Sequence, residues 1–311
     1  MIRVTTGSRL HFGLFGLAAP AGGPAARSFG GCGLMVREPA VRVAVRPAGD
    51  WRADGPLAGR ALDFARRFAG SLPPGALAPQ HVTVEACPPE HAGLGVGTQL
   101  GLAVARALNR AAGLPDLDAA ELARRVGRGA RSAVGVHGFA RGGFVVEGGQ
   151  RAPGELAPLV AHAPFPAAWR VVLLRPAEGG AWHGERERAA FAALCGPTDP
   201  ALTDRLCRLV LLGMLPALAE ADLPAFGEAV SEFNARAGEL FRPVQGGTYA
   251  SAEVEEVIRW ARRQSMHGVG QSSWGPTVFA LAESEPQAAE WAARLEARYQ
   301  QKWHATVSRA T

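Results

Sequence analysis

The sequence predicts an α+β protein built from two lobes, and three observations lead to that fold class. Helix-like and strand-like segments are intermixed along the 311 residues, with neither an internal repeat nor a long linker. Hydrophobic residues make up 48% and charged residues 20%, which excludes a disordered chain, a coiled coil and a collagen-like repeat. Residues 150–166 are rich in Pro, Ala and Gly. We therefore expect lobes at 1–160 and 161–311, with mixed sheets and packed helices.

Strand signals come first along the chain. Residues 41–46 and 81–85 alternate apolar and polar side chains, the period of two that marks a half-buried strand. Asp118, followed by Glu121 three residues later, matches a capping box at the start of a helix. In this half we expect strands at 2–4, 9–14, 41–46, 81–85 and 144–146, and helices at 57–68, 98–112 and 117–129.

The second half is expected to hold longer helices around a few short strands. Residues 171–174 read Val-Val-Leu-Leu, which is typical of a buried strand. Residues 268–276 are rich in Gly and Ser and are expected to form a loop. The other elements expected here are helices at 200–212, 223–239, 251–264 and 286–301, and strands at 277–282 and 305–308.

The charge pattern favours small anionic ligands. The net charge is +5, from 33 basic and 28 acidic residues, and Lys302 is the only lysine. An anion clamp must therefore use Arg, backbone N–H groups or helix termini, and catalysis by Lys is almost excluded. The arginines are spread along the chain without a basic stripe, so we expect no nucleic-acid groove.

The cysteines and the apolar stretches indicate a cytoplasmic protein. The four cysteines have neither metal-ligand spacing nor a disulfide pattern and are expected to be isolated thiols of a reducing compartment. The apolar stretch 209–219 is too short to span a bilayer. Residues 10–26 loosely resemble a signal peptide, but His11, several glycines and Pro20 interrupt the apolar run. We expect no membrane partner.

The central motif is Gly-Leu-Gly-Val-Gly-Thr-Gln at 93–99, between a strand and a helix. Glycines on alternate positions allow the backbone to approach a ligand closely. The helix that follows offers unpaired N–H groups and the positive end of its dipole, and Thr98 and Gln99 add side-chain donors. The spacing fits neither a Walker A motif nor a Rossmann fingerprint. The motif predicts an anion site, although a tight turn that needs small residues explains the glycines about equally well.

Three further segments place polar side chains among glycines. Residues 268–276 favour a ligand loop, because a merely flexible turn has no need of Gln, two Ser and a Trp. Residues 127–143 also fit a solvated loop, and a lone His within 6–13 is more often structural than catalytic. The polar residues of these segments are Ser8, Arg9 and His11; Arg131, Ser132, His137 and Arg141; and Gln271, Ser272, Ser273 and Trp274.

Together the four segments resemble the GHMP kinase superfamily, which has an N-terminal strand motif, a glycine-rich phosphate loop that opens a helix, and a late Gly/Ser loop before a strand. Two departures argue against kinase activity. The loop reads Gly-Leu-Gly-Val-Gly-Thr-Gln instead of the usual Gly-Leu-Gly-Ser-Ser. The position where such kinases often place a catalytic Asp, seven residues before a Gly-Gly pair, is Gly135. The usual base for a substrate hydroxyl is therefore missing.

A non-kinase branch of that superfamily fits better. The chain resembles the β-ribofuranosylaminobenzene 5′-phosphate synthase family over about residues 2 to 281. The most specific matches are Gly-Leu-Gly-x-Gly-Thr-Gln at 93–99, with His91 before it, and Gln-Ser-Ser-Trp-Gly-Pro-Thr at 271–277. Other matches are Ser-Arg-Leu-His at 8–11, Gly-Arg-Gly-x-x-Ser-x-x-Gly at 127–135, the segment 142–149, Gly-Glu-x-Glu at 184–187 and Leu-Pro-Ala-Leu at 215–218.

The resemblance implies a decarboxylating phosphoribosyl transfer. 4-Aminobenzoate, or 4-hydroxybenzoate by the same chemistry, condenses with phosphoribosyl pyrophosphate and releases CO2 and pyrophosphate, in tetrahydromethanopterin biosynthesis. It also implies Mg²⁺ as cofactor and a homodimer. Arg9, Arg131 and Arg141 are candidates for the 5′-phosphate or the carboxylate, and which of them holds which stays open. Two other functions remain: a small-molecule kinase that uses ATP, and a non-catalytic sensor of phosphorylated metabolites.

The resemblance and the loop chemistry together give a set of candidate site residues. The expected catalytic residues are Arg9, His11, His137 and Arg141, and Glu185 is the expected Mg²⁺ ligand. The expected substrate-binding residues are Ser8, His91, Gly93, Gly95, Gly97, Thr98, Gln99, Arg131, Ser132, Gln271, Ser272, Ser273 and Trp274.

Overall fold

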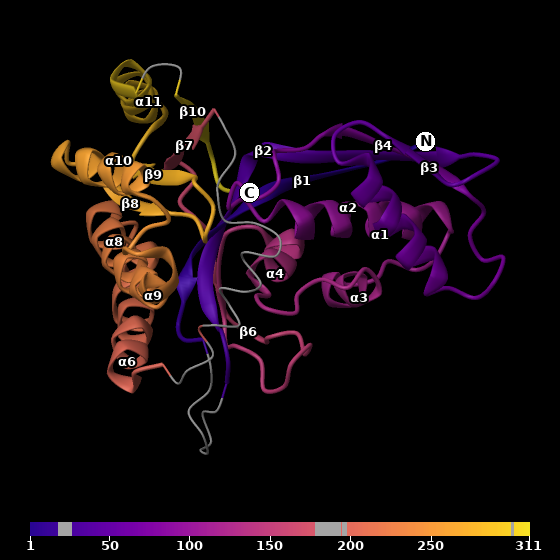
Figure 1. Ribbon diagram of the computed structural model, residues 1–311, viewed down its shortest axis with the longest axis horizontal. Helices are drawn as coiled ribbons and strands as arrows, with labels where there is room; N and C mark the ends of the chain where they lie inside the picture. Colours follow the sequence, from indigo (N-terminus) through magenta and orange to yellow (C-terminus); the bar gives the residue numbers. More distant parts are fainter. Residues whose placement is uncertain (18–26, 178–193, 195–197, 300–301) are drawn as a thin grey trace.

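Two sheets with helical layers make up the computed structural model (Figure 1). The structure describes residues 1–17, 27–177, 194, 198–299 and 302–311. Helices and strands are mixed in both halves of the chain, which confirms the predicted α+β class. No helix in these ranges is long and apolar enough to cross a membrane.

The first sheet is built around two long antiparallel strands. β1 (Ile2–Leu14) pairs with β2 (Gly31–Pro47), and the sheet continues in the order β3-β4-β2-β5-β6. Segments 2–4 and 9–14 form one strand instead of the two expected, because a register shift at Gly7 carries the chain through. The other strands are β3 (Arg52–Asp54), β4 (Gln80–Ala86), β5 (Phe144–Glu147) and β6 (Leu159–Ala163).

Four helices accompany this sheet, to the right in Figure 1. α2 (Val96–Ala111) is almost fully buried over β1 and β2, and α1 (Ala58–Gly70) packs on α2. α3 (Ala119–Arg125) begins at Asp118, whose side chain accepts a hydrogen bond from the Glu121 N–H, as the capping box predicts. α4 (Val134–Arg141) was not expected and lies within the segment 127–143.

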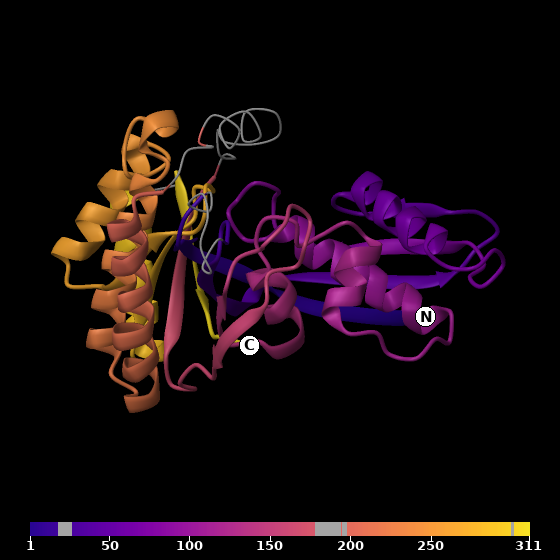
Figure 2. The ribbon, with the colours of Figure 1, turned by 90° about the horizontal axis from the view of Figure 1, so that it is seen from below.

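The second sheet has the order β10-β7-β9-β8 and an outer layer of helices, seen edge-on in Figure 2. Residues 268–271, expected to be loop, belong to β8, because their glycines let α8 lie close: a Cβ on Gly270 would meet the Asn234 side chain at 2.5 Å. The strands are β7 (Arg170–Pro176), β8 (His267–Gln271), β9 (Val278–Ala282) and β10 (Trp303–Ser308). The helices are α6 (Pro200–Leu209), the π-helical turn η1 (Val210–Met214), α7 (Leu215–Glu220), α8 (Leu223–Glu239), α9 (Arg242–Gln245), α10 (Ala252–Arg263) and α11 (Glu285–Tyr299).

One apolar core joins the two sheets. The Phe12 ring on β1 lies 5.0 Å from the Phe279 ring on β9, and Phe144 on β5 meets Phe226 on α8 edge-on at 5.8 Å. All four side chains are fully buried. This packing fixes β1 against β8, β9 and α8, and the polar residues of these elements meet beside it.

Candidate active site

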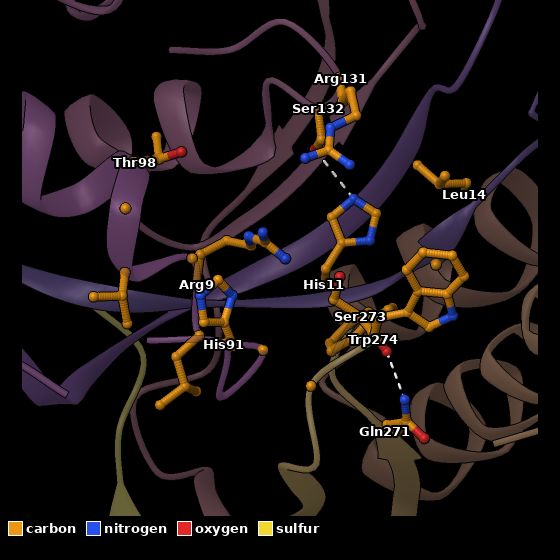
Figure 3. Close-up of a pocket in the computed structure, with 18 of the residues that line it drawn as sticks. Arg9, His11, Leu14, His91, Thr98, Arg131, Ser132, Gln271, Ser273 and Trp274 are labelled. Atoms are coloured by element: carbon orange, nitrogen blue, oxygen red, sulfur yellow. Dashed lines mark hydrogen bonds between the residues drawn. The ribbon is translucent and has the colours of Figure 1, made fainter. Parts of the chain in front are cut away.

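A cavity of about 640 Å³ lies beside this core. Its wall combines β1, the glycine loop at the start of α2, the segment 127–132, α8, the region around α9 and residues 271–275. Figure 3 shows side chains from these separate segments converging on one space. A volume of this size is typical of small-molecule sites.

The glycine loop is held in place through its carbonyl oxygens. The carbonyl oxygens of Ala92, Gly93 and Leu94 accept hydrogen bonds from the Thr277 hydroxyl, the Ser272 hydroxyl and the Arg9 N–H. Gly95 has φ +67° and begins α2 without a side-chain cap. An uncapped N-terminus of a 16-residue helix, open to a cavity, is suited to bind an anion.

Basic side chains surround this helix end. Arg9, Arg60, Arg128 and Arg131 all line the cavity. Arg128 donates to the Thr98 hydroxyl at 3.3 Å, and Arg60 pairs with Glu90. Burial lowers the pKa of Arg60, but a guanidinium stays charged. Arg9, Arg60 and Arg128 lie against the first turn of α2, whereas Arg131 is drawn beside Ser132 in Figure 3. Three guanidinium groups beside one carboxylate therefore form a positive end of the cavity, suited to diphosphate or phosphate oxygens.

His11 lies in the middle of the cavity, between Arg9 and Trp274 (Figure 3). Its Nε2 is 3.1 Å from the Ser132 hydroxyl, and its backbone N–H donates to Ser272. Burial holds the pKa of His11 well below its usual value, and the positive charge of Arg9 lowers the pKa further. The imidazole is therefore neutral at physiological pH and can accept or donate a proton at the cavity surface.

The opposite end of the cavity is apolar and aromatic. Trp274 is nearly buried, packs edge-on against Phe241 at 4.7 Å, and donates its indole N–H to Gln245. Leu14 and Phe29 also line the cavity. His91 and Ser273, which also line the cavity, have φ of +61° and +55°, a strained conformation for residues other than glycine. The arrangement offers one face to an aromatic ring.

The comparisons with known proteins agree with this geometry. Residues 57–143 match the model for the GHMP kinases N terminal domain, and residues 214–301 match the model for GHMP kinases C terminal. Relatives named beta-ribofuranosylphenol 5′-phosphate synthase come from Methanothermobacter thermautotrophicus (31% identical) and Archaeoglobus fulgidus (33% identical). Each alignment covers 91% of this chain, and 89% and 88% of the two relatives. The chain belongs to the beta-ribofuranosylphenol 5′-phosphate synthase family.

Solved structures with the same fold include kinases and a decarboxylase. Homoserine kinase from Cytophaga hutchinsonii aligns with a TM-score of 0.70 at 16% identity, over 99% of this chain and 94% of that chain. Mevalonate pyrophosphate decarboxylase from Streptococcus pyogenes aligns with a TM-score of 0.69 at 14% identity, over 100% and 96%. These likenesses show the fold alone, which confirms the predicted GHMP kinase-like architecture.

Most of the candidate residues of this family member come together at the cavity. Those on the cavity wall are Arg9, His11, His91, Gly93, Gly95, Gly97, Thr98, Arg131, Ser132, Gln271, Ser273 and Trp274.

The other candidates lie outside the cavity wall. Ser8 donates its hydroxyl to the Pro39 carbonyl. The Gln99 side chain accepts a hydrogen bond from the Thr6 hydroxyl and donates one to the Gly135 carbonyl. Both side chains therefore connect separate segments in the interior. Ser272 bridges Gly93 and His11 from behind. His137 is within 2.8 Å of the Ala157 carbonyl, and Arg141 ends α4 away from the cavity, because the unexpected helix turns both side chains elsewhere. Glu185 lies outside the described residues.

The sequence analysis missed several residues of the wall. Arg60 comes from α1, and nothing local in its helix marks it; the cavity-facing position follows only from the packing of α1 on α2. Arg128 is part of the matched motif at 127–135 but was not chosen as a candidate, and Glu90 directly precedes His91 and could have been found as its neighbour. Phe241 and Gln245 lie near the short α9, which carries no strong pattern.

Proposed function

We propose that this protein catalyses the decarboxylating condensation of 4-hydroxybenzoate or 4-aminobenzoate with phosphoribosyl pyrophosphate, a step of tetrahydromethanopterin biosynthesis. The observation that carries the proposal is one cavity with a basic end at the α2 N-terminus and an aromatic end at Trp274, in a chain of this synthase family. The donor carries the phosphate and diphosphate groups, and the acceptor carries the aromatic ring and one carboxylate. The relatives' names specify a phenol product and thus favour 4-hydroxybenzoate.

The proposed reaction forms one C–C bond and breaks one C–O bond and one C–C bond. The ring carbon that bears the carboxylate attacks the anomeric carbon, and the electron pair of the breaking C–O bond leaves with pyrophosphate. The C–C bond to the carboxylate then breaks, its electron pair restores the aromatic ring, and CO2 departs. Donors at the start of α2 stabilise the charge that develops on pyrophosphate, and the cavity holds the two carbon atoms in line.

The residues at the basic end are compatible with Mg²⁺. Glu90 is the one carboxylate on the cavity wall within the described ranges, and the Thr98 hydroxyl lies at the same end. One or two carboxylates suffice for Mg²⁺ when substrate phosphates supply further oxygens. Bound there, the ion would neutralise the leaving pyrophosphate. We expect chelation to abolish turnover and added Mg²⁺ to restore it. The homodimer remains a prediction.

A carbon-14 release assay tests the function directly. The protein, Mg²⁺, phosphoribosyl pyrophosphate and either carboxyl-labelled benzoate are mixed, and CO2 is counted with and without the donor. Donor-dependent release is expected. If neither benzoate releases CO2 while ATP is consumed with a small-molecule acceptor, the protein is a kinase. Binding of phosphoribosyl pyrophosphate without any turnover would indicate a sensor.

A further inference from the structure

A buried carboxylate lies behind the cavity wall. Glu147, the last residue of β5, has no exposed surface and does not line the cavity. Neither of its carboxylate oxygens makes a hydrogen bond of ordinary length within the described part of the chain. The donors that act on it are the Ser132 hydroxyl and the backbone N–H groups of Ala133 and Val134. An ionisable group buried in this way is costly to the fold and calls for a reason.

Ser132 connects this carboxylate to the cavity. Its hydroxyl faces Glu147 on one side and lies 3.1 Å from Nε2 of His11 on the other. His11 and Ser132 line the cavity, whereas Glu147 does not. The three side chains therefore form a line that leads from the cavity into the interior.

Burial opposes a charge at both ends of this line. Burial and the nearby Arg9 guanidinium oppose a positive charge on His11. Burial raises the pKa of Glu147, and this outweighs the attraction of Ser132, the two N–H groups and Arg9. Arg9 on β1 and Cys32 on β2 are the other ionisable groups that act on this carboxylate. Passing a proton from His11 to the ionised form of Glu147 therefore leaves the imidazole neutral and removes a buried negative charge.

We propose that Glu147, acting through Ser132 and His11, holds the hydroxyl proton of a hydroxybenzoate acceptor during the reaction and returns it afterwards. The proposal rests on the proposed function and concerns the choice of acceptor. The phenol proton moves to His11 while the Nε2 proton moves to Ser132, and the Ser132 proton moves to the ionised Glu147. After CO2 has left, the same transfers run in reverse and the product is a neutral phenol. Glu147 is thus a positioning residue that never touches the substrate.

The two acceptors differ in whether they must give up a proton to Glu147 through Ser132 and His11. A phenolate donates electrons to the para ring carbon far better than a phenol does, so removal of the hydroxyl proton activates the carbon that must attack. The nitrogen of 4-aminobenzoate already donates a lone pair and loses no proton before the attack. Glu147 therefore favours the hydroxyl acceptor and is of little use to the amine.

The test compares acceptors in Glu147→Gln, which keeps the shape of the side chain and cannot take the proton. We expect kcat/KM with 4-hydroxybenzoate to fall at least tenfold and kcat/KM with 4-aminobenzoate to change less than twofold. Ser132→Ala, which breaks the line in the middle, should shift the ratio of the two values in the same direction. Glu155→Gln, the same change at an exposed Glu outside the cavity wall, is the matched control and should leave the ratio unchanged.

A pre-ionised acceptor separates proton transfer from structural damage. Fluorine atoms beside the hydroxyl make 3,5-difluoro-4-hydroxybenzoate a stronger acid, so that it enters the cavity as the phenolate. The difference between wild type and Glu147→Gln should shrink markedly with this acceptor. Thermal unfolding of the variant establishes that it is folded. An equal loss with all three acceptors, or no loss with any, overturns the proposal.

The outcomes also separate this proposal from the proposed function. If the wild type releases CO2 from neither benzoate, the function itself fails and the proposal falls with it. If the wild type uses both and Glu147→Gln slows both equally, the function stands and the proton line does not. A wild type that uses 4-aminobenzoate alone likewise leaves the function intact and overturns the line.

Discussion

Arg60 lies directly against the backbone of Gly97, where the first turn of α2 faces the cavity. A Cβ built on Gly97 would meet Nη2 of Arg60 at 2.5 Å. The absence of a side chain there thus lets a guanidinium from another helix lie over the anion site. The same guanidinium pairs with Glu90, so its position is fixed from two sides.

We expect Gly97→Ala to weaken donor binding while the fold is kept. The methyl group displaces the flexible end of Arg60, and the KM for phosphoribosyl pyrophosphate should rise about tenfold, the loss typical of one charge-assisted hydrogen bond. Gly59→Ala is the matched control, because the space around Gly59 on α1 is open. An unchanged KM in Gly97→Ala would remove Arg60 from the donor site. Steady-state kinetics and a thermal melt provide both readouts.

Ser272 fixes the glycine loop to β1 with a single hydroxyl. It donates to the Gly93 carbonyl at 2.6 Å and accepts from the His11 N–H at 3.1 Å, and the residue is fully buried. Ser272→Ala should lower the free energy of unfolding by about 2–3 kcal/mol, because two buried backbone groups lose their partner. Urea unfolding measures this difference. A loss below about 0.5 kcal/mol would mean that the loop holds its place without the hydroxyl.

At the scale of elements, the helices with clear caps and periodicity were predicted well. α3 starts at the expected Asp118, and α2 starts two residues before its predicted limit. α4 was missed because six glycines in 127–143 hide a helix that outside contacts hold: Gln99 donates to the Gly135 carbonyl, and Met35 packs on Gly138. Such contacts come from distant segments, and a local pattern does not contain them.

An ion-pair cluster on α3 predicts a pH-dependent stability. Hydrogen bonds from Arg124 and Arg125 lower the pKa of Glu121 from its usual 4.5 to about 2. The carboxylate therefore stabilises the folded state fully above about pH 4.5, and this contribution is lost as the pH falls toward 2. Because Arg124 is exposed and Glu121 is partly exposed to solvent, Glu121→Gln should cost less than about 1 kcal/mol at pH 7.

Urea unfolding of the wild type and Glu121→Gln from pH 7 down to pH 3 checks this cluster. The difference between the two should decrease steadily below pH 4.5, and high salt should reduce it at pH 7. A difference of the same size at pH 7 and pH 3 would assign it to packing and not to charge.

At the scale of the whole molecule, the last residues join the two sheets. The chain leaves β10 and runs along β2: Arg37 donates its N–H to the Arg309 carbonyl, Thr311 to that of Met35, and Gly143 to that of Thr311. Figure 1 shows the C-terminus beside β2, between the two halves. These bonds link the end of the chain to the strands that carry the site.

Removal of residues 309–311 should therefore lower the free energy of unfolding by about 3 kcal/mol, since three interstrand hydrogen bonds are lost. Thr311→Ala keeps all the backbone groups and should change it by less than about 0.5 kcal/mol. Thermal or urea unfolding of both variants provides the comparison. Equal stability of the truncated and complete chains would show that these three hydrogen bonds contribute nothing to the link between the two sheets.

The motifs predicted several segments of the cavity wall, but not its full set of charges. Glycine loops and their polar residues stand out in a sequence because they do not fit helix or strand patterns, and most of them line the cavity. Arg60 and the Glu147 line depend on how α1 packs on α2 and how β5 pairs with β2, which only the folded chain defines. The lobe limits 1–160 and 161–311 stay a prediction.

The bond from the His11 N–H to Ser272 joins residues that are 261 positions apart. Ser273 adds a second such link, from its N–H to the His11 carbonyl. During synthesis from the N-terminus, a ribosome must therefore deliver nearly the entire chain before His11 acquires these two neighbours. Partly made chains contain β1 and the glycine loop without the completed cavity, so the reaction proposed above cannot begin before translation is nearly complete.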